Sequence, residues 1–185
     1  MTPEDPEAVS RALLDAYRRL VRNGVASNIS FAALARAAGM NEADLRKAYP
    51  GEEELLLAVH KYMCAQLTQH VIDSISGYPA GVRRIQAAVS AFLDACLKNR
   101  FLRSLQISLQ SASDTARQVW QEHRDGYEKL LAMSFKSMGL SGAEPLARSL
   151  LQRIEEVAHS EMKAGRVLPD MRDTLAREIS SMVTH

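Results

Sequence analysis

Residues 30–49 read SFAALARAAGMNEADLRKAY, and this stretch decides the fold. Ser30 and Asn41 each precede a short run with helical spacing, at the position where a side-chain oxygen caps the first turn of a helix. Gly39 lies between the runs, where the chain needs a residue that accepts a positive φ. The five alanines of the first run allow a second helix to cross it closely. The stretch therefore predicts two short helices joined by a tight turn, the helix-turn-helix arrangement.

Outside this stretch, apolar residues recur at steps of three and four, and strict alternation is nearly absent. The pattern predicts an all-α chain with about nine helices, including a first helix over residues 6–23 and a short one around residues 101–109. We expect a three-helix N-terminal helix-turn-helix domain over residues 1–51. A larger C-terminal helical bundle is expected over residues 52–185.

The composition is that of an ordinary globular protein, with 46% hydrophobic and 24% charged residues and a formal net charge of +1. This balance gives no bulk electrostatic argument for binding nucleic acid or a membrane surface. Cys64 and Cys96 lie in apolar stretches and form no CxxC pair, which favours buried free thiols in a reducing compartment. No signal peptide and no apolar run of about 18 residues is present, so we expect a soluble cytoplasmic protein without a membrane partner.

Residues 30–41 resemble the TetR family of bacterial transcriptional regulators, whose pattern here is Thr-hydrophobic-x-x-Ile-Ala-x-x-Ala-Gly-Val-Ser. Leu45 and Tyr49 fall on the Leu and Phe of the family's Leu-Tyr-x-His-Phe segment. Residues 53–56 resemble the start of its fourth helix. The match covers about the first 60 residues, and the remainder agrees only in the number and length of its helices. The resemblance implies a homodimeric, ligand-responsive repressor that binds a palindromic DNA operator.

This interpretation predicts a set of DNA contacts in and around the helix-turn-helix. They are Ser30, Arg36, Asn41, Arg46, Lys47 and Tyr49. The chain also departs from the family, because the Tyr that commonly contacts phosphate is Arg46, the His is Ala48, and the Lys near the start of the fourth helix is Glu52. Residues 1–61 hold eight Lys and Arg against nine Asp and Glu, whereas DNA binding gains affinity from basic residues. A TetR-fold sensor or protein-interaction module that has lost DNA binding is therefore the alternative.

The resemblance also implies a ligand pocket between the middle helices of the larger domain. The predicted lining residues are Met63, Leu67, Phe92, Cys96, Phe101, Leu105, Trp120 and Tyr127. Their chemistry favours a small apolar or aromatic ligand of unknown identity. Ordinary core packing gives the same sequence pattern as an apolar pocket, so that alternative stays open.

The last two helices resemble the family's four-helix dimer interface. The apolar residues assigned to it are Leu150, Ile154, Val157, Leu175, Ile179 and Met182. Burial of the same residues within one chain is the alternative.

Motifs for catalysis are weak or missing. Residues 160–163 spell SxxK, a serine-hydrolase pattern, but its companion motifs are absent. The sequence contains no GxSxG or HExxH motif, and none of the five histidines pairs at a spacing of four. We therefore predict neither an enzyme nor a metal or cofactor site.

Overall fold

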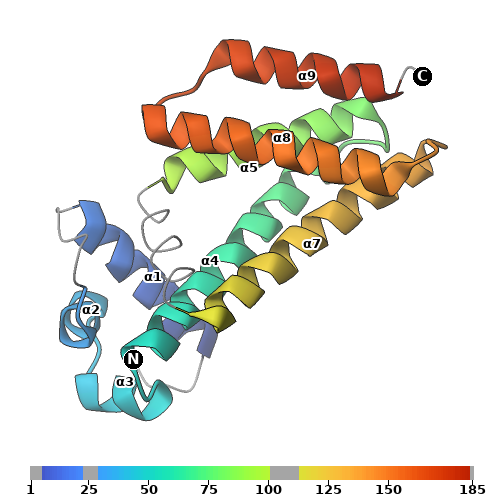
Figure 1. Ribbon diagram of the computed structural model, residues 1–185. Helices are drawn as coiled ribbons and strands as arrows, with labels where there is room; N and C mark the ends of the chain where they lie inside the picture. The colour runs from blue at the N-terminus through green and yellow to red at the C-terminus, as the bar shows by residue number, and fades with distance from the viewer. Residues whose placement is uncertain (1–5, 23–28, 101–112, 184–185) are drawn as a thin grey trace. The chain divides into compact units, whose positions relative to one another are not determined.

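The structure is a computed structural model that describes residues 6–22, 29–100 and 113–183, and every regular element in these ranges is an α-helix. The helices are α1 (Pro6–Arg22), α2 (Phe31–Ala38), α3 (Glu42–Ala48), α4 (Glu52–Ile75), α5 (Val82–Lys98), α7 (Asp114–Ser137), α8 (Ala143–Ala164) and α9 (Pro169–Val183) (Figure 1). The prediction of an all-α fold is confirmed. The helix predicted around residues 101–109 lies outside the described residues.

Two compact units share the chain, and neither is continuous in sequence. One comprises residues 1–66 and 101–119, and the other comprises residues 67–100 and 120–185. The helices α4 and α7 contribute residues to both units. The boundary predicted between residues 51 and 52 divides the chain by expected function, into a helix-turn-helix domain and a helical bundle. It stays a prediction.

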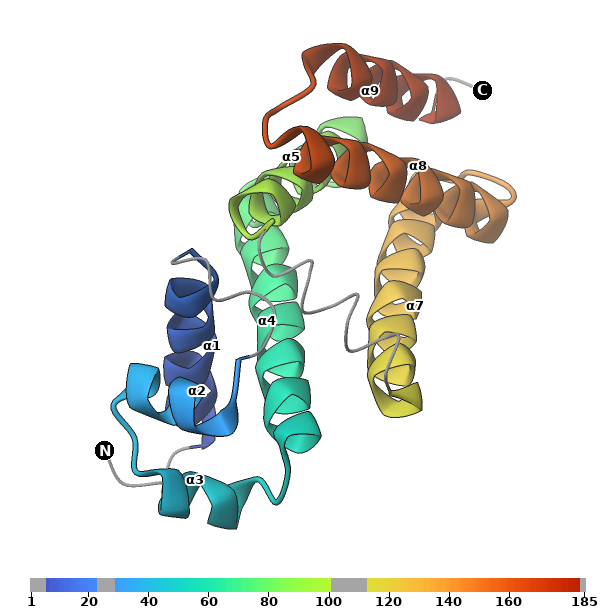
Figure 2. The same ribbon diagram turned by 60° about the vertical axis from the view of Figure 1, so that its left-hand side comes forward.

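The first unit is built around the apolar faces of α1, α2 and α3 and the first half of α4 (Figure 2). Leu13 and Leu14 of α1, Leu34 of α2 and Leu55 of α4 are almost fully buried there. Burying a Leu side chain stabilises a fold by about 1.5–3 kcal/mol, so these four residues fix α2 on its neighbours. The short helix α3 is attached to the same core through Leu45.

The second unit has its own core, to which α5, α7, α8 and α9 contribute (Figure 1). Phe135 of α7, Leu150 of α8 and Leu175 of α9 are almost fully buried in it. In both views α8 runs beside α5 and α9 (Figure 2). This unit therefore has a core of its own, separate from the helix-turn-helix.

None of the described helices combines the length and apolar character that crossing a membrane requires.

Candidate functional site

The helix-turn-helix forms as the sequence predicts, because its ends are fixed by local hydrogen bonds. The Ser30 side chain caps α2 by accepting from the Ala33 N–H at 3.2 Å, and Asn41 caps α3 by accepting from the Ala43 N–H at 2.8 Å. Gly39 ends α2 in the left-handed conformation, with φ at 67°. The Met40 N–H then donates to the Ala35 carbonyl at 3.0 Å, which closes the turn.

The position of α3 leaves most of its surface in solvent. Leu45 is its one buried residue, 3% exposed. Asn41, Asp44, Arg46 and Lys47 are all exposed around it. A helix held by a single apolar anchor, with polar side chains on its remaining faces, has the form needed to enter a DNA major groove.

Both cations of α3 are paired with carboxylates of the same helix. Arg46 donates to Glu42 Oε1 from Nη2 at 2.7 Å and from Nε at 2.9 Å. Lys47 Nζ lies 3.3 Å from Asp44 Oδ1. The Arg46 guanidinium also stands 4.4 Å from the centre of the Phe31 ring, which places it over α2. The outer side of α3 is therefore close to electrically neutral.

The remaining predicted DNA contacts have different environments. Arg36 is exposed in the last turn of α2, and Ser30 is exposed while its hydroxyl caps that helix. Tyr49 is half-buried, caps α3 with its backbone and packs against the first core. Three exposed carboxylates, those of residues 52–54, form the first turn of α4. No described group of three or more His, Cys, Asp and Glu is placed to hold a metal ion.

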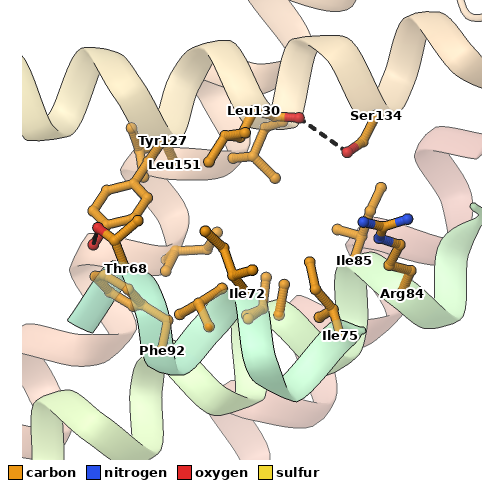
Figure 3. A pocket seen from close by; sticks show the side chains of 15 residues that line it. Thr68, Ile72, Ile75, Arg84, Ile85, Phe92, Tyr127, Leu130, Ser134 and Leu151 are labelled. Atoms are coloured by element: carbon orange, nitrogen blue, oxygen red, sulfur yellow. Dashed lines mark hydrogen bonds between the residues drawn. The ribbon is translucent and has the colours of Figure 1, made fainter. Parts of the chain in front are cut away.

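The second unit contains a partly open cavity of about 180 Å³. Residues from α4, α5, α7 and α8 surround it (Figure 3). They are Thr68, Val71, Ile72, Ile75, Arg84, Ile85, Ala88, Val89, Phe92, Tyr127, Leu130, Leu131, Ser134, Leu151 and Ile154. Most of these side chains are apolar, which is typical of a site for a small organic molecule.

Two of the predicted ligand contacts line this cavity, namely Phe92 and Tyr127. Their rings meet edge to face with centroids 5.5 Å apart, and the Tyr127 hydroxyl lies 2.9 Å from Thr68 Oγ1. The pair forms one end of the cavity (Figure 3).

The other predicted ligand contacts lie elsewhere. Leu67 and Cys96 pack against the second core, and Met63 packs against the first core. Trp120 is half-buried and does not belong to the cavity wall. Phe101 and Leu105 lie outside the described residues.

The sequence interpretation missed the contribution of the second half of α4. Thr68, Val71, Ile72 and Ile75 are spaced at intervals of three, one and three, so they share one face of that helix. This spacing is visible in the sequence and marks an apolar helix face, but it does not separate a cavity wall from ordinary core packing. Arg84 was also missed, because no sequence signal separates a cation at a cavity from one on an ordinary surface.

The residues assigned to the dimer interface need correction. Leu150, Ile154, Val157, Leu175 and Ile179 are all buried inside a single chain, and Met182 packs against the same core. Periodicity correctly marks these positions as buried, but the second unit itself covers them. Five of the six therefore have no surface to offer to a second copy.

The described helices thus define an all-α protein with a helix-turn-helix in one unit and an apolar cavity in the other. Solved structures with a similar fold include a transcriptional regulator from Rhodococcus sp. RHA1, with a TM-score of 0.78 and 17% identity over 97% of this chain and 96% of the other. A TetR transcription regulator from Haloarcula marismortui has a TM-score of 0.74 and 17% identity, over 95% and 96% of the two chains.

A third similar structure is a TetR-family transcription regulator from Marinobacter aquaeolei VT8, with a TM-score of 0.64 and 16% identity over 95% of each chain. No family model and no curated protein matches the sequence. The fold of the chain is that of the TetR-type transcription regulators.

Proposed function

We propose that this chain is a DNA-binding transcriptional regulator of the TetR type. The observation that carries the proposal is the exposed side of α3, which holds Asn41, Arg46 and Lys47 on a helix anchored only by Leu45. Guanidinium and ammonium groups bind phosphate oxygens, and the amide of Asn has the geometry to bind an adenine edge. Arg36 of α2, which is also exposed, adds a further cation for the DNA backbone.

We propose that the chain acts as a homodimer, because a single α3 would contact only one half-site of a palindromic operator. Two copies related by a two-fold axis would present their α3 helices about 34 Å apart, one turn of B-DNA, to a palindromic operator. Because five of the predicted interface side chains are buried in the monomer, we assign no residues to the contact between copies.

Regulation is proposed to pass through the cavity of the second unit. A ligand changes operator binding only if it binds one arrangement of the dimer more tightly than another. We propose that the liganded arrangement no longer fits both half-sites, which makes the protein a repressor that is released by its effector.

The experiment is a mobility-shift assay with the full chain and the DNA upstream of its own gene, at low salt. Wild type is expected to shift the fragment, whereas Arg46→Ala and Lys47→Ala weaken binding by about tenfold each in the dimer, since every contact is used twice. Lys129→Ala, an exposed cation on α7, is the matched control and should bind like wild type. Equal binding by all four proteins would refute the role of α3.

One observation favours a second candidate, a TetR-fold sensor or interaction protein without DNA binding. Both α3 cations are neutralised within the helix, and residues 52–54 add three carboxylates close in sequence. Exposed ion pairs are worth only about 0–1 kcal/mol, however, so a phosphate can compete with Glu42 and Asp44 for these cations. Failure of wild type to shift any promoter fragment would favour this candidate.

A further inference from the structure

We propose that the cavity of the second unit takes a small amphipathic carboxylate, with an apolar body about the size of one substituted aromatic ring and its carboxylate on Arg84. This inference rests on the proposed function, because it names the chemical class of the effector. Three properties of the cavity carry it: its volume, the one charged side chain among its described lining residues, and the hydrogen-bond partners of its other polar groups.

The volume limits the apolar body of the ligand. The cavity measures about 180 Å³. An apolar protein cavity of about 150 Å³ binds benzene, so this one has room for a ring with a short substituent. The side chains around the space, including Ile72, Ile75 and Leu130, are aliphatic and match such a body (Figure 3).

Arg84 sets the charge of the ligand. Among the described residues that line the cavity it is the one charged side chain, and no carboxylate in the described part of the chain forms an ion pair with it. It is half-buried in the first turn of α5, and its guanidinium lies on the Ser134 side of the cavity (Figure 3). A guanidinium next to aliphatic side chains favours a planar anion that accepts two parallel hydrogen bonds.

A carboxylate fits this position better than a phosphate monoester. A carboxylate carries one charge, which one guanidinium balances, whereas a phosphate monoester carries about −1.5 to −2 at neutral pH. The excess charge would lie against an apolar wall without a partner, and such burial is costly.

The polar groups at the opposite end of the cavity already have hydrogen-bond partners. The hydroxyls of Thr68 and Tyr127 lie 2.9 Å apart and bond to each other. Tyr127 also stacks edge to face on Phe92. The ligand is therefore polar at the Arg84 end and apolar at the Tyr127 end.

Isothermal titration calorimetry of the full chain with 4-ethylbenzoate and with 4-ethylbenzamide tests the proposal. The two compounds have nearly the same shape and differ in charge. Wild type is expected to bind the benzoate about ten- to a hundredfold more tightly, the usual worth of a hydrogen bond to a charged group. Equal affinity for the two compounds would overturn the role of Arg84, and no binding of either up to about 1 mM would overturn the ligand class.

Arg84→Gln is expected to abolish this preference by weakening binding of the benzoate while leaving the benzamide unchanged. Arg83→Gln is the matched control, because Arg83 is the adjacent exposed arginine and does not line the cavity. It should retain the wild-type ratio. A preference that persists in Arg84→Gln would overturn the assignment.

Because the titrations contain no DNA, their outcome is separate from that of the mobility-shift assay. Binding of DNA without a carboxylate preference would refute this inference and leave the proposed function in place. A carboxylate preference without DNA binding would refute the proposed function and leave the ligand class of the cavity in place.

Discussion

The Arg46 side chain of α3 is fixed in position by one neighbour, and its charge is neutralised by another. Its guanidinium lies over the Phe31 ring and donates twice to Glu42. Each side chain of the ion pair is about half exposed, 52% for Arg46 and 42% for Glu42, so the pair contributes only about 0.3–0.5 kcal/mol. The contact with Phe31 adds about 0.5–1 kcal/mol and fixes the guanidinium over α2. In the proposed complex a DNA phosphate would therefore compete with Glu42, while the ring keeps Arg46 in place.

Replacing Glu42 with glutamine is expected to strengthen DNA binding by about three- to tenfold at low salt. The change removes a carboxylate that repels phosphate and competes for Arg46. The gain should shrink as salt is raised from about 50 to 200 mM, because screening weakens the repulsion. Fluorescence anisotropy with a labelled upstream fragment measures both effects. Asp173→Asn, at an exposed carboxylate of α9, is the control, and unchanged or weaker binding by Glu42→Gln would count against α3 as the DNA contact.

The turn between α2 and α3 depends on a single backbone angle. Gly39 has a φ of 67°, and a Cβ built there would meet nothing within 4 Å. Gly39→Ala is therefore expected to destabilise the protein through backbone strain alone, by about 1–2 kcal/mol. Gly77→Ala is the matched control, since Gly77 also has space for a Cβ but no positive φ. Urea unfolding of the two variants makes the comparison, and an equal effect of both would show that φ is not the cause.

At the scale of elements, the sequence predicted the helix-turn-helix closely because helix ends are local. Ser30, Gly39 and Asn41 act on residues no more than four positions away, and the structure has each in its predicted role. The cavity could be predicted only in part. Phe92 and Tyr127 are the two of the eight predicted residues that line it, whereas the role of Arg84 depends on which helices meet around it.

The helix α1 supplies a pH-dependent contribution to the first unit. Burial raises the pKa of Tyr17 from 10.0 to about 12, because the charged phenolate would lie in an apolar environment. Between pH 10 and pH 12 the unfolded chain loses this proton and the folded chain keeps it, so the free energy of unfolding falls as the pH rises. The full loss amounts to about 2–3 kcal/mol by pH 12.

Tyr17→Phe should remove this part of the alkaline destabilisation. The free energy of unfolding of wild type is expected to fall more steeply than that of the variant above about pH 10, and to be similar below it. Urea titrations at several pH values measure the difference. Tyr78→Phe, at an exposed tyrosine, controls for loss of a phenol hydroxyl. Parallel pH profiles for wild type and Tyr17→Phe would contradict the prediction.

At the scale of the whole molecule, the sequence could identify buried positions but not what buries them. Leu150, Ile154 and Leu175 have the spacing of an apolar helix face, and the structure places them in the core of the second unit. The same spacing would serve a face shared with another copy. Deciding between the two requires the path of α5 and α9 beside α8, which depends on contacts distant in sequence.

Glu161 is the clearest case of a residue whose role only the folded chain reveals. In the sequence it belongs to the SxxK match, whereas in the structure it is fully buried on α8. It accepts from Arg172 Nε and Nη2, both at 2.7 Å, and from the Leu168 N–H at 2.9 Å. These hydrogen bonds raise the pKa of Arg172, which also donates to Asp94 of α5 at 2.6 Å. The cluster therefore joins α5, α8 and α9.

Glu161→Leu is expected to lower the free energy of unfolding by about 3–5 kcal/mol, because it leaves Arg172 largely buried without its main partner. Asp94→Asn removes an exposed carboxylate from the same cluster and should cost less than about 1 kcal/mol. The double variant Glu161→Leu with Arg172→Met should regain much of the loss, since two apolar side chains replace both charges. Urea unfolding of the three variants provides the values. A double variant no more stable than Glu161→Leu would mean that the loss comes from packing or from the Leu168 N–H, and not from the unpaired charge.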